Sequence, residues 1–257
     1  MNRFQKLFKT KNSPVLSVYF TAGFPGIQDT AEIIRQLSDA GIDMIEIGIP
    51  FSDPMADGPV IQHSSQIALN NGMTLPLMFE QLKDIRKITD IPLVLMGYLN
   101  PVLQYGFEAF CTKAAETGID GLIIPDLPMR EYLNNFQGIV QKSGLENILL
   151  ITPETSEERI RMIDANSHSF IYMVSTASIT GAKKNFGENT VAYFKRVQEM
   201  NLINPVLTGF GVSNRETFET ACQYSRGAIT GSVFIRCLQQ TSDISKAVKS
   251  LLETLHS

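Results

Sequence analysis

Glu46 is the first residue whose type and setting indicate chemistry. It lies inside the apolar run MIEIGIP (44–50), which has the composition of a buried β-strand. A carboxyl group enclosed by aliphatic side chains has a raised pKa, so it can donate a proton and take it back near neutral pH. A structural Glu paired with Lys or Arg is the alternative, although those cations fall mostly on expected helices and late loops. Glu46 is therefore a candidate general acid and base.

Two more carboxylates follow in the loop after this strand. Asp53 and Asp57 belong to the stretch FSDPMADGP (51–59), in which Pro and Gly indicate turns. Aspartates in loops commonly fix turns or cap helices, so each of the two has a structural alternative. Together with Glu46, they predict a site that contains more than one carboxyl group.

Two expected strands, residues 205–211 and 227–233, both end in glycine-containing turns that run into helical segments. They are the last two of the eight strands expected below. These turns are Gly209-Phe210-Gly211 and Gly231-Ser232. Glycine lets backbone N–H groups approach an anion, and a helix N-terminus adds favourable partial charge. Such turns are common without any ligand, but two of them at neighbouring strand ends predict a phosphate site.

The segment Thr176–Thr190 is long, polar and rich in small residues. This composition is typical of a lid that closes over substrate, and an ordinary mobile surface loop is the alternative. On closure, Thr180 and Gly181 are expected to reach the phosphate.

Three further polar residues lie on or just after expected strands. They are Tyr19, Asp126 and Tyr172. Each fits a place in the site, and each fits an ordinary core or turn position equally well.

These candidates require strands that end at a common face, and the chain supplies eight. Short apolar runs alternate with longer segments of helical period. The expected strands are residues 15–23, 44–50, 92–98, 121–126, 147–152, 170–175, 205–211 and 227–233. Continuous apolar runs are typical of parallel strands covered on both faces. Eight βα units of about 30 residues predict a (β/α)8 TIM barrel, with an open doubly wound sheet as the alternative.

The whole chain, residues 1–257, is expected to form a single barrel domain, because no linker or shift in composition divides it. The stretch MNRFQKLFKT (1–10) predicts a short amphipathic N-terminal helix, and extra helices are expected near residues 60–69 and 75–85. Ser213 and Glu216 have the spacing of a capping box.

Strand alternation predicts where Glu46 points. Ile45, Ile47 and Ile49 share one face of their strand, and Glu46 lies on the other. The isoleucines are expected to pack against helices, which turns Glu46 into the barrel. It lies near the carboxyl end of its strand, and active sites of such barrels lie at that end.

Composition argues against several other classes of protein. The net charge is −4 without a Lys/Arg block, which disfavours nucleic acid and anionic membranes as partners. No apolar run approaches the ~20 residues of a membrane span. The cysteines Cys111, Cys222 and Cys237 are few and far apart, as in a cytoplasmic protein. The histidines fall outside the strand ends, so no metal site is expected, and no strand-end Lys indicates an imine mechanism.

Several motifs together resemble the tryptophan synthase α chain family. The first is E-x-G-x-P-x-S-D-P-x-A-D-G at residues 46–58. Further motifs in the family's order are FTAGFPG, DLP at 126–128, a loop ending TGA at Ala182, GFGVS at 209–213 and GAITGS at 227–232. The resemblance covers nearly the whole chain and implies a barrel lyase that cleaves indole-3-glycerol phosphate to indole and glyceraldehyde 3-phosphate.

The resemblance also implies roles for individual residues. Glu46 matches the family's catalytic acid and base, and Asp57 matches the aspartate that binds the indole N–H. Thr180 matches a lid threonine, and Tyr172 a tyrosine near the catalytic glutamate. The implied phosphate-binding residues are Gly181, Gly209, Gly211, Gly231 and Ser232. Those implied for the indole pocket are Tyr19, Ile61, Met96, Leu122 and Asp126, with Tyr19 and Met96 standing where some relatives have Phe and Leu.

The family resemblance implies a partner and no cofactor in this chain. Pyridoxal phosphate is expected on a partner β chain, in an α2β2 assembly that the loop 50–54 and the segment Asn100-Pro101 would contact. A free-standing lyase, another phosphate-binding barrel isomerase or decarboxylase, and a non-catalytic activator of a β chain are the alternatives. The last two do not explain why Glu46 and Asp57 occur together.

Overall fold

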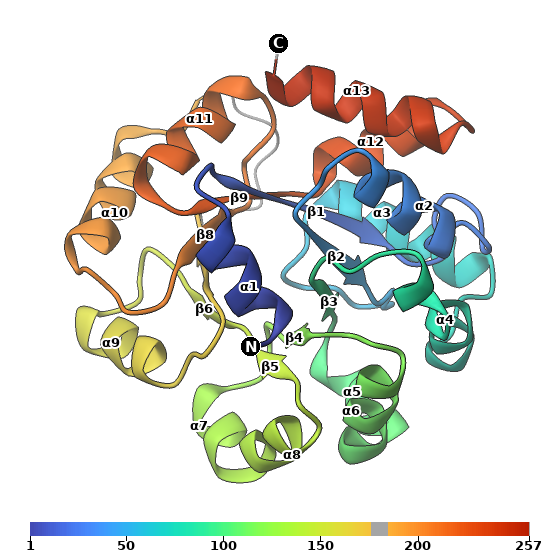
Figure 1. The fold of residues 1–257 in the computed structure, drawn as a ribbon, viewed down its shortest axis with the longest axis horizontal. Coiled ribbons are helices and arrows are strands. Elements are labelled where there is room, and N and C mark those ends of the chain that lie inside the picture. The colour runs from blue at the N-terminus through green and yellow to red at the C-terminus, as the bar shows by residue number, and fades with distance from the viewer. Residues whose placement is uncertain (176–184, 257) are drawn as a thin grey trace.

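The protein is a parallel β-barrel surrounded by helices (Figure 1), seen in a computed structural model that describes residues 1–175 and 185–256. The strands are β1 (Val15–Thr21), β2 (Met44–Gly48), β3 (Leu93–Met96), β4 (Gly121–Ile123), β5 (Glu146–Asn147), β6 (Leu149–Ile151), β7 (Ile171–Val174), β8 (Val206–Gly209) and β9 (Gly227–Thr230). Their order in the sheet is β5-β4-β3-β2-β1-β9-β8-β7-β6. All pairs are parallel, and the two strands at the ends of this order, β5 and β6, follow one another in the chain. The sheet therefore nearly closes on itself, which confirms the expected barrel and excludes the open sheet.

The fifth expected strand, residues 147–152, is divided into two short strands, β5 and β6. β5 pairs with β4, and β6 pairs with β7, so the two ends of the sheet meet around Ile148. The amide of Ile148 still donates to the carbonyl of Leu122 in β4, at 2.9 Å. The segment that contains β5 and β6 thus bonds first to β4 and then to β7, which nearly closes the barrel.

Helices follow the strands and cover the outside of the barrel. They are α1 (Arg3–Thr10), α2 (Thr30–Asp39), α3 (Pro59–Asn70), α4 (Leu75–Leu82), η1 (Ile85–Lys87), α5 (Leu99–Tyr105), α6 (Phe107–Glu116), α7 (Met129–Glu131), η2 (Tyr132–Phe136), α8 (Gln137–Lys142), α9 (Glu157–Ala165), α10 (Glu188–Glu199), α11 (Arg215–Tyr224), α12 (Ser232–Gln240) and α13 (Ile244–His256). The extra helix expected near residues 60–69 is α3, and the one expected near 75–85 is α4 followed by η1.

The capping box expected at the start of α11 lies one residue further along the chain. Asn214, rather than Ser213, is the N-cap, and its side chain accepts from the amide of Thr217 at 2.9 Å. Thr217 takes the place expected for Glu216, because its hydroxyl accepts from the backbone amide of Asn214 at 3.1 Å. A cap of this kind satisfies backbone donors that the first turn of a helix leaves unpaired.

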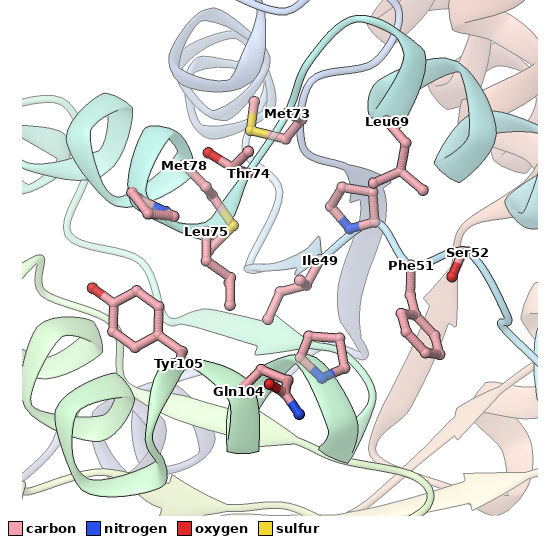
Figure 2. A pocket seen from close by; sticks show the side chains of 13 residues that line it. Ile49, Phe51, Ser52, Leu69, Met73, Thr74, Leu75, Met78, Gln104 and Tyr105 are labelled. Atoms are coloured by element: carbon pink, nitrogen blue, oxygen red, sulfur yellow. The ribbon is translucent and has the colours of Figure 1, made fainter.

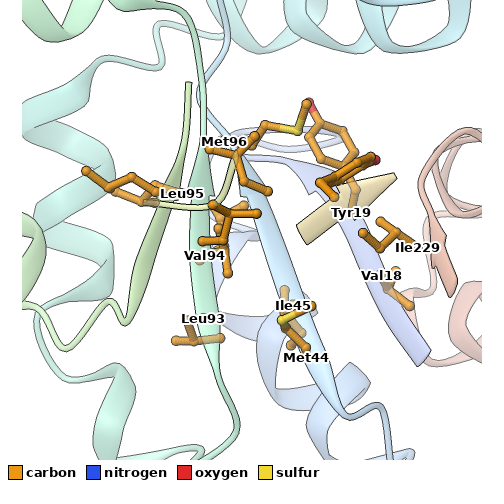
Figure 3. Packing of buried hydrophobic residues seen from close by; sticks show 14 of the residues in the cluster. Val18, Tyr19, Met44, Ile45, Leu93, Val94, Leu95, Met96 and Ile229 are labelled. Carbon is orange, nitrogen blue, oxygen red and sulfur yellow. The ribbon is translucent and has the colours of Figure 1, made fainter. Parts of the chain in front are cut away.

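The apolar strands form the core, as their composition predicts. Figure 3 shows β1, β2 and β3 with buried side chains such as Val18, Ile45 and Val94 packed among them. Ile45 and Ile47 are completely buried. Each side chain of this kind stabilises the fold by about 1.5–3 kcal/mol relative to an exposed position.

The N-terminal helix α1 covers the barrel at the amino ends of the strands, where it lies across the ring of strands (Figure 1). Its Phe4 is completely buried, and the Phe4 and Phe170 ring centroids are 5.9 Å apart. Arg3 adds an ion pair with Asp120, just before β4, at 3.0 Å. The opposite end of the barrel, where the strands terminate, therefore holds the accessible loops.

Candidate active site

Glu46 lies inside the barrel on β2, completely buried. The hydroxyl of Ser17 on the neighbouring strand β1 donates to its Oε1 at 3.3 Å. Among the residues that the structure describes, its other oxygen, Oε2, has no hydrogen-bond partner. Burial raises the pKa of Glu46 to about 8, and the bond from Ser17 opposes this rise only in part. The group is therefore largely protonated at neutral pH, which suits a proton donor.

Two tyrosines share this interior with Glu46. Tyr172 on β7 is buried, and its pKa is raised well above the usual value, first by burial and then by the negative charges of Glu46 and Asp57. Burial also raises the pKa of Tyr19 on β1, and the charges of Asp57 and Glu46 contribute. Both tyrosines therefore stay neutral, and both lie within electrostatic range of the two carboxyl groups.

Asp57 lies in the loop between β2 and α3, where Tyr98 holds it. The hydroxyl of Tyr98, just after β3, donates to Oδ2 of Asp57 at 3.0 Å. The same hydroxyl accepts from the amide of Ala56 at 2.9 Å, so it bonds two successive residues of the loop. Burial raises the pKa of Asp57 to about 6, while the bond from Tyr98 lowers it. Asp57 is therefore mostly ionised at neutral pH, unlike Glu46.

Glycines at two strand ends make room for the two interior tyrosines. A Cβ atom on Gly48, at the end of β2, would lie 2.1 Å from the hydroxyl oxygen of Tyr19. A Cβ atom on Gly209, at the end of β8, would lie 2.2 Å from the hydroxyl oxygen of Tyr172. A side chain fits at either position only if the tyrosine moves, because such distances are far below van der Waals contact. The glycine at 209 thus has a packing reason besides any contact with an anion.

The turn after β8 has an unusual backbone. Phe210 and Gly211 both have positive φ, at +64° and +73°. A bulky residue rarely adopts this conformation, because its Cβ then crowds the backbone, whereas glycine tolerates it. The carbonyl of Phe210 accepts from the hydroxyl of Ser175, which follows β7, at 2.6 Å.

The second glycine turn begins helix α12. Gly231 is the N-cap and Ser232 the first helical residue, so the free amides of this helix start at the end of β9. Just before them, Thr230 donates to the carbonyl of Val212 at 2.9 Å. This bond ties the end of β9 to the turn after β8. Both glycine turns therefore lie at neighbouring strand ends on one side of the barrel.

The residues expected to line an indole pocket come from several elements at this end. Ile61 lies on α3 and Met96 ends β3, and both are buried. Leu122 on β4 is buried too, but it pairs with Leu95, which pairs with Ile47, so it lies on the face of the sheet opposite to Glu46. Asp126 is exposed and accepts from the amide of Leu99 at 2.8 Å, so it holds the start of α5. Asp53 is exposed too and accepts from the hydroxyl of its neighbour Ser52 at 2.6 Å, as a turn residue does.

Two expected site residues, Thr180 and Gly181, lie outside the described residues, as does much of the segment 176–190. Within the described ranges, no group of three or more His, Cys, Asp or Glu side chains is placed to hold a metal ion.

An apolar cavity of about 410 Å³ lies beside the barrel end rather than inside it. Its lining comes from the loop after β2, the end of α3, the start of α4, and α5. Figure 2 shows Ile49 and Leu75 pointing toward one another across it, with Phe51 and Gln104 nearby. None of the expected catalytic or phosphate-binding residues lines this cavity, so it is separate from the interior around Glu46.

Tyr98, Ser17 and Ser175 contact the site and were not expected from the sequence. Tyr98 follows an expected strand, as Asp126 does, so its position at a strand end was a usable signal. Ser17 lies two residues before Tyr19, on the same face of β1, and strand alternation would have found it. The role of Ser175 depends on the conformation of a turn 35 residues away, which the sequence does not reveal.

Comparisons with known proteins agree with one another. The family model described as "Tryptophan synthase alpha chain" matches residues 4–256. A tryptophan synthase alpha chain from Phocaeicola vulgatus is 58% identical over 256 residues, covering 99% of each chain. The crystal structure of tryptophan synthase subunit alpha from Legionella pneumophila has a TM-score of 0.88 and 33% identity, covering 99% of this chain and 97% of that one.

The fold is also similar to a chain of a solved complex. The structure of a tryptophan synthase complex from Pyrococcus furiosus matches with a TM-score of 0.84 and 32% identity, covering 94% of this chain and 97% of that one. Separately, none of the helices within residues 1–175 and 185–256 has the length and apolarity that crossing a membrane requires.

Proposed function

This chain belongs to the tryptophan synthase alpha chain family, and on that premise we propose that Glu46 carries the proton transfers of the family's reaction. That reaction cleaves indole-3-glycerol phosphate to indole and glyceraldehyde 3-phosphate in tryptophan biosynthesis, so the protein is a carbon–carbon lyase. The observation that carries the proposal is a completely buried carboxyl group with a pKa of about 8 at the barrel's interior face.

The proposed chemistry is a retro-aldol cleavage with no net change in protons. Neutral Glu46 donates its proton to C3 of the indole ring, and the ring becomes a cationic indolenine that accepts electrons. The resulting carboxylate takes the proton of the glycerol hydroxyl next to the scissile bond. The carbonyl of glyceraldehyde 3-phosphate forms, the carbon–carbon bond breaks, and its electron pair restores the aromatic indole. Glu46 is then neutral again, so one group serves as acid and as base.

Asp57 complements Glu46 because it is ionised when Glu46 is neutral. We assign it the indole N–H, whose positive charge grows when C3 is protonated. A carboxylate at that point stabilises the developing charge more than it stabilises the neutral substrate, which is what accelerates a reaction. The environments of the two carboxyl groups separate their pKa values, about 8 against about 6, and this separation supports the assignment.

The phosphate of the substrate is assigned to the neighbouring turns after β8 and β9. Gly211 and Gly231 permit close approach of backbone amides, and α12 contributes the positive end of its dipole at Ser232. Gly181 and Thr180 belong to the same proposal through their family motif alone. Ile61 and Met96 supply apolar surface for the indole ring. Tyr19 and Tyr172 enclose Glu46 and keep water from it.

The reaction is tested by incubating the full chain with indole-3-glycerol phosphate and measuring indole release. Glu46→Gln should abolish most turnover. Glu146→Gln is the control, because Glu146 is also a glutamate with a raised pKa, but it is only partly buried and is bonded to Asn2 at the opposite end of the barrel. Wild-type-like turnover by Glu46→Gln would exclude Glu46 as the proton carrier.

We further propose that the chain works with a β chain in an α2β2 assembly. Members of this family carry no cofactor of their own, and pyridoxal phosphate is assigned to the β chain. The similarity to a subunit of the Pyrococcus furiosus complex supports a β-chain partner. Pro50, Phe51 and Pro101 line the same apolar cavity, so the two segments expected to meet the partner are neighbours, which supports this proposal. Adding a β chain to the indole assay tests this, since a free-standing lyase would show no change.

The last two proposals concern organisation and location. The described residues share one sheet and one main core, which supports a single domain over 1–257. The three cysteines are free thiols, as in proteins of the reducing cytoplasm, where we place this one.

A further inference from the structure

The turn after β8 contains a peptide group that departs from strand geometry. In a regular strand, successive carbonyls point to opposite sides within the sheet. Here the carbonyls of Gly209 and Phe210 both point toward β7, because Ser175 bonds both of them. Its amide donates to Gly209 at 3.0 Å, and its hydroxyl donates to Phe210 at 2.6 Å. The peptide that joins Phe210 to Gly211 is therefore turned over relative to the strand that precedes it.

This inversion determines the direction of one amide. In a planar trans peptide the N–H is antiparallel to the C=O. The carbonyl of Phe210 points toward the β7 side, so the amide hydrogen of Gly211 points toward the β9 side. The sheet order β9-β8-β7 puts Gly231 and Ser232 on that side, at the start of α12. The amide of Gly211 therefore points toward the turn at Gly231 and Ser232.

The inverted conformation needs support. Phe210 has φ of +64°, which an aromatic residue adopts only when its surroundings impose it. Ser175 is completely buried, so its hydroxyl has no water to bond and its carbonyl partner holds it in place. Thr230 donates to the carbonyl of Val212, two residues after Phe210, from the β9 side. The turn is thereby fixed from both neighbouring strands.

We propose that Ser175 is a positioning residue for phosphate binding: its hydroxyl holds the Phe210–Gly211 peptide inverted, so that the Gly211 amide is presented to the anion. Ser175 itself does not touch the substrate. This inference rests on the proposed phosphate site, and it adds the residue that sets the orientation of one donor in that site. Strained backbone conformations held by neighbouring side chains are typical of such sites.

The test compares Ser175→Ala with Ser167→Ala in the full chain. Ser167 is a matched control, because its buried hydroxyl also donates to a backbone carbonyl, that of Ile163 at 2.8 Å, but it precedes β7 at the other end of the barrel. The probe is sn-glycerol 3-phosphate, titrated by calorimetry. Ser175→Ala should bind it about 3- to 10-fold more weakly, as expected for one lost hydrogen bond. Ser167→Ala should bind it like the wild type.

Two further readouts separate positioning from a merely structural role. Ser175→Ala should raise KM for indole-3-glycerol phosphate, leave kcat nearly unchanged, and leave kcat/KM for unphosphorylated indole-3-glycerol at the wild-type value. The Gly211 amide resonance should move on phosphate titration in the wild type and move much less in Ser175→Ala. Ser175→Cys preserves volume and a weak donor, so it should fall between the two even if Ser175→Ala folds poorly.

The outcomes distinguish this inference from the site on which it rests. Wild-type affinity of Ser175→Ala for glycerol 3-phosphate overturns the role of Ser175 alone. If the wild-type Gly211 amide does not respond to the probe, the phosphate assignment fails and the role of Ser175 fails with it. Equal losses for phosphorylated and unphosphorylated substrate would also overturn the inference, because they would show a general loss of structure.

Discussion

The hydroxyl of Tyr98 donates to Oδ2 of Asp57 at 3.0 Å, and the same oxygen accepts from the amide of Ala56 at 2.9 Å. One side chain after β3 thus fixes both the backbone and the carboxylate of a loop that follows β2. The rings of Tyr98 and Phe51 pack with centroids 5.3 Å apart, which holds the tyrosine in place. Asp57 is accordingly pre-organised, although it lies in a loop.

Tyr98→Phe should lower kcat/KM by roughly 10- to 100-fold, because a hydrogen bond to a charged group contributes about 1.5–3 kcal/mol. The bond from Tyr98 also lowers the pKa of Asp57, so its loss should move the acid limb of the pH–rate profile to higher pH. The profile of kcat/KM between pH 5 and 9 measures both effects. An unshifted acid limb with normal kcat/KM would show that the bond has no role in catalysis.

The two carboxyl groups should give a bell-shaped pH dependence in the wild type. Asp57, with a pKa of about 6, must be ionised, so activity should fall as the pH drops through that value. Glu46, with a pKa of about 8, must be protonated, so activity should fall as the pH rises through it. The optimum is expected between these values. A rate that keeps rising beyond pH 9 would contradict the assignment of Glu46 as the acid.

Glu46 should also make the free energy of unfolding depend on pH. Its pKa is raised from 4.5 to about 8, so the folded protein keeps a proton that the unfolded chain loses. The stability from this group is complete below about pH 4.5 and is lost as the pH rises through about 8. Glu46→Gln lacks this loss, so its stability relative to wild type should rise across that window by a few kcal/mol. Urea unfolding at pH 5 and pH 8.5 gives the comparison; parallel curves would contradict it.

Gly48→Ala tests the packing of Tyr19 over β2. The added Cβ would lie 2.1 Å from the tyrosine hydroxyl oxygen, so the ring must move. We expect a loss of about 1–3 kcal/mol in stability and a marked loss of activity, because Tyr19 helps to enclose Glu46. Gly138→Ala, on α8, is the control: nothing lies within 4 Å of its added Cβ. Thermal unfolding and indole release should leave the control at or slightly above wild type.

Gly211→Ala should chiefly weaken binding of phosphorylated ligands. Its φ is +73°, and its added Cβ would lie 3.1 Å from the ring of Phe186. Gly41→Ala imposes similar backbone strain, at a φ of +81°, where nothing lies within 4 Å of the added Cβ. Both variants should lose about 1 kcal/mol of stability, and only Gly211→Ala should lose affinity for glycerol 3-phosphate. Equal affinity in the two variants would place the phosphate elsewhere.

The sequence predicted the features that depend on local pattern. Alternation along β2 predicts the inward direction of Glu46, and eight apolar runs predict the barrel, because each signal lies within a few residues. The exact cap of α11 differed by one residue, since Ser213 and Asn214 are both good N-caps and only packing selects between them.

Features that depend on two distant segments could not be predicted in the same way. The bond from Tyr98 to Asp57 spans 41 residues, and the bond from Ser175 to Phe210 spans 35. Both depend on loop conformations that the rest of the barrel imposes. The bond from the amide of Leu99 to the carboxylate of Asp126 likewise joins two distant segments, so the sequence alone does not reveal it.

Helix α1 affects where substrate can enter the barrel and where products can leave it. Phe4 is buried at the amino ends of the strands and Arg3 is paired with Asp120, so α1 covers that end of the barrel. Because the proposed site lies at the opposite end, we expect substrate to enter and both products to leave there. A protein docked at that end would therefore determine where released indole goes.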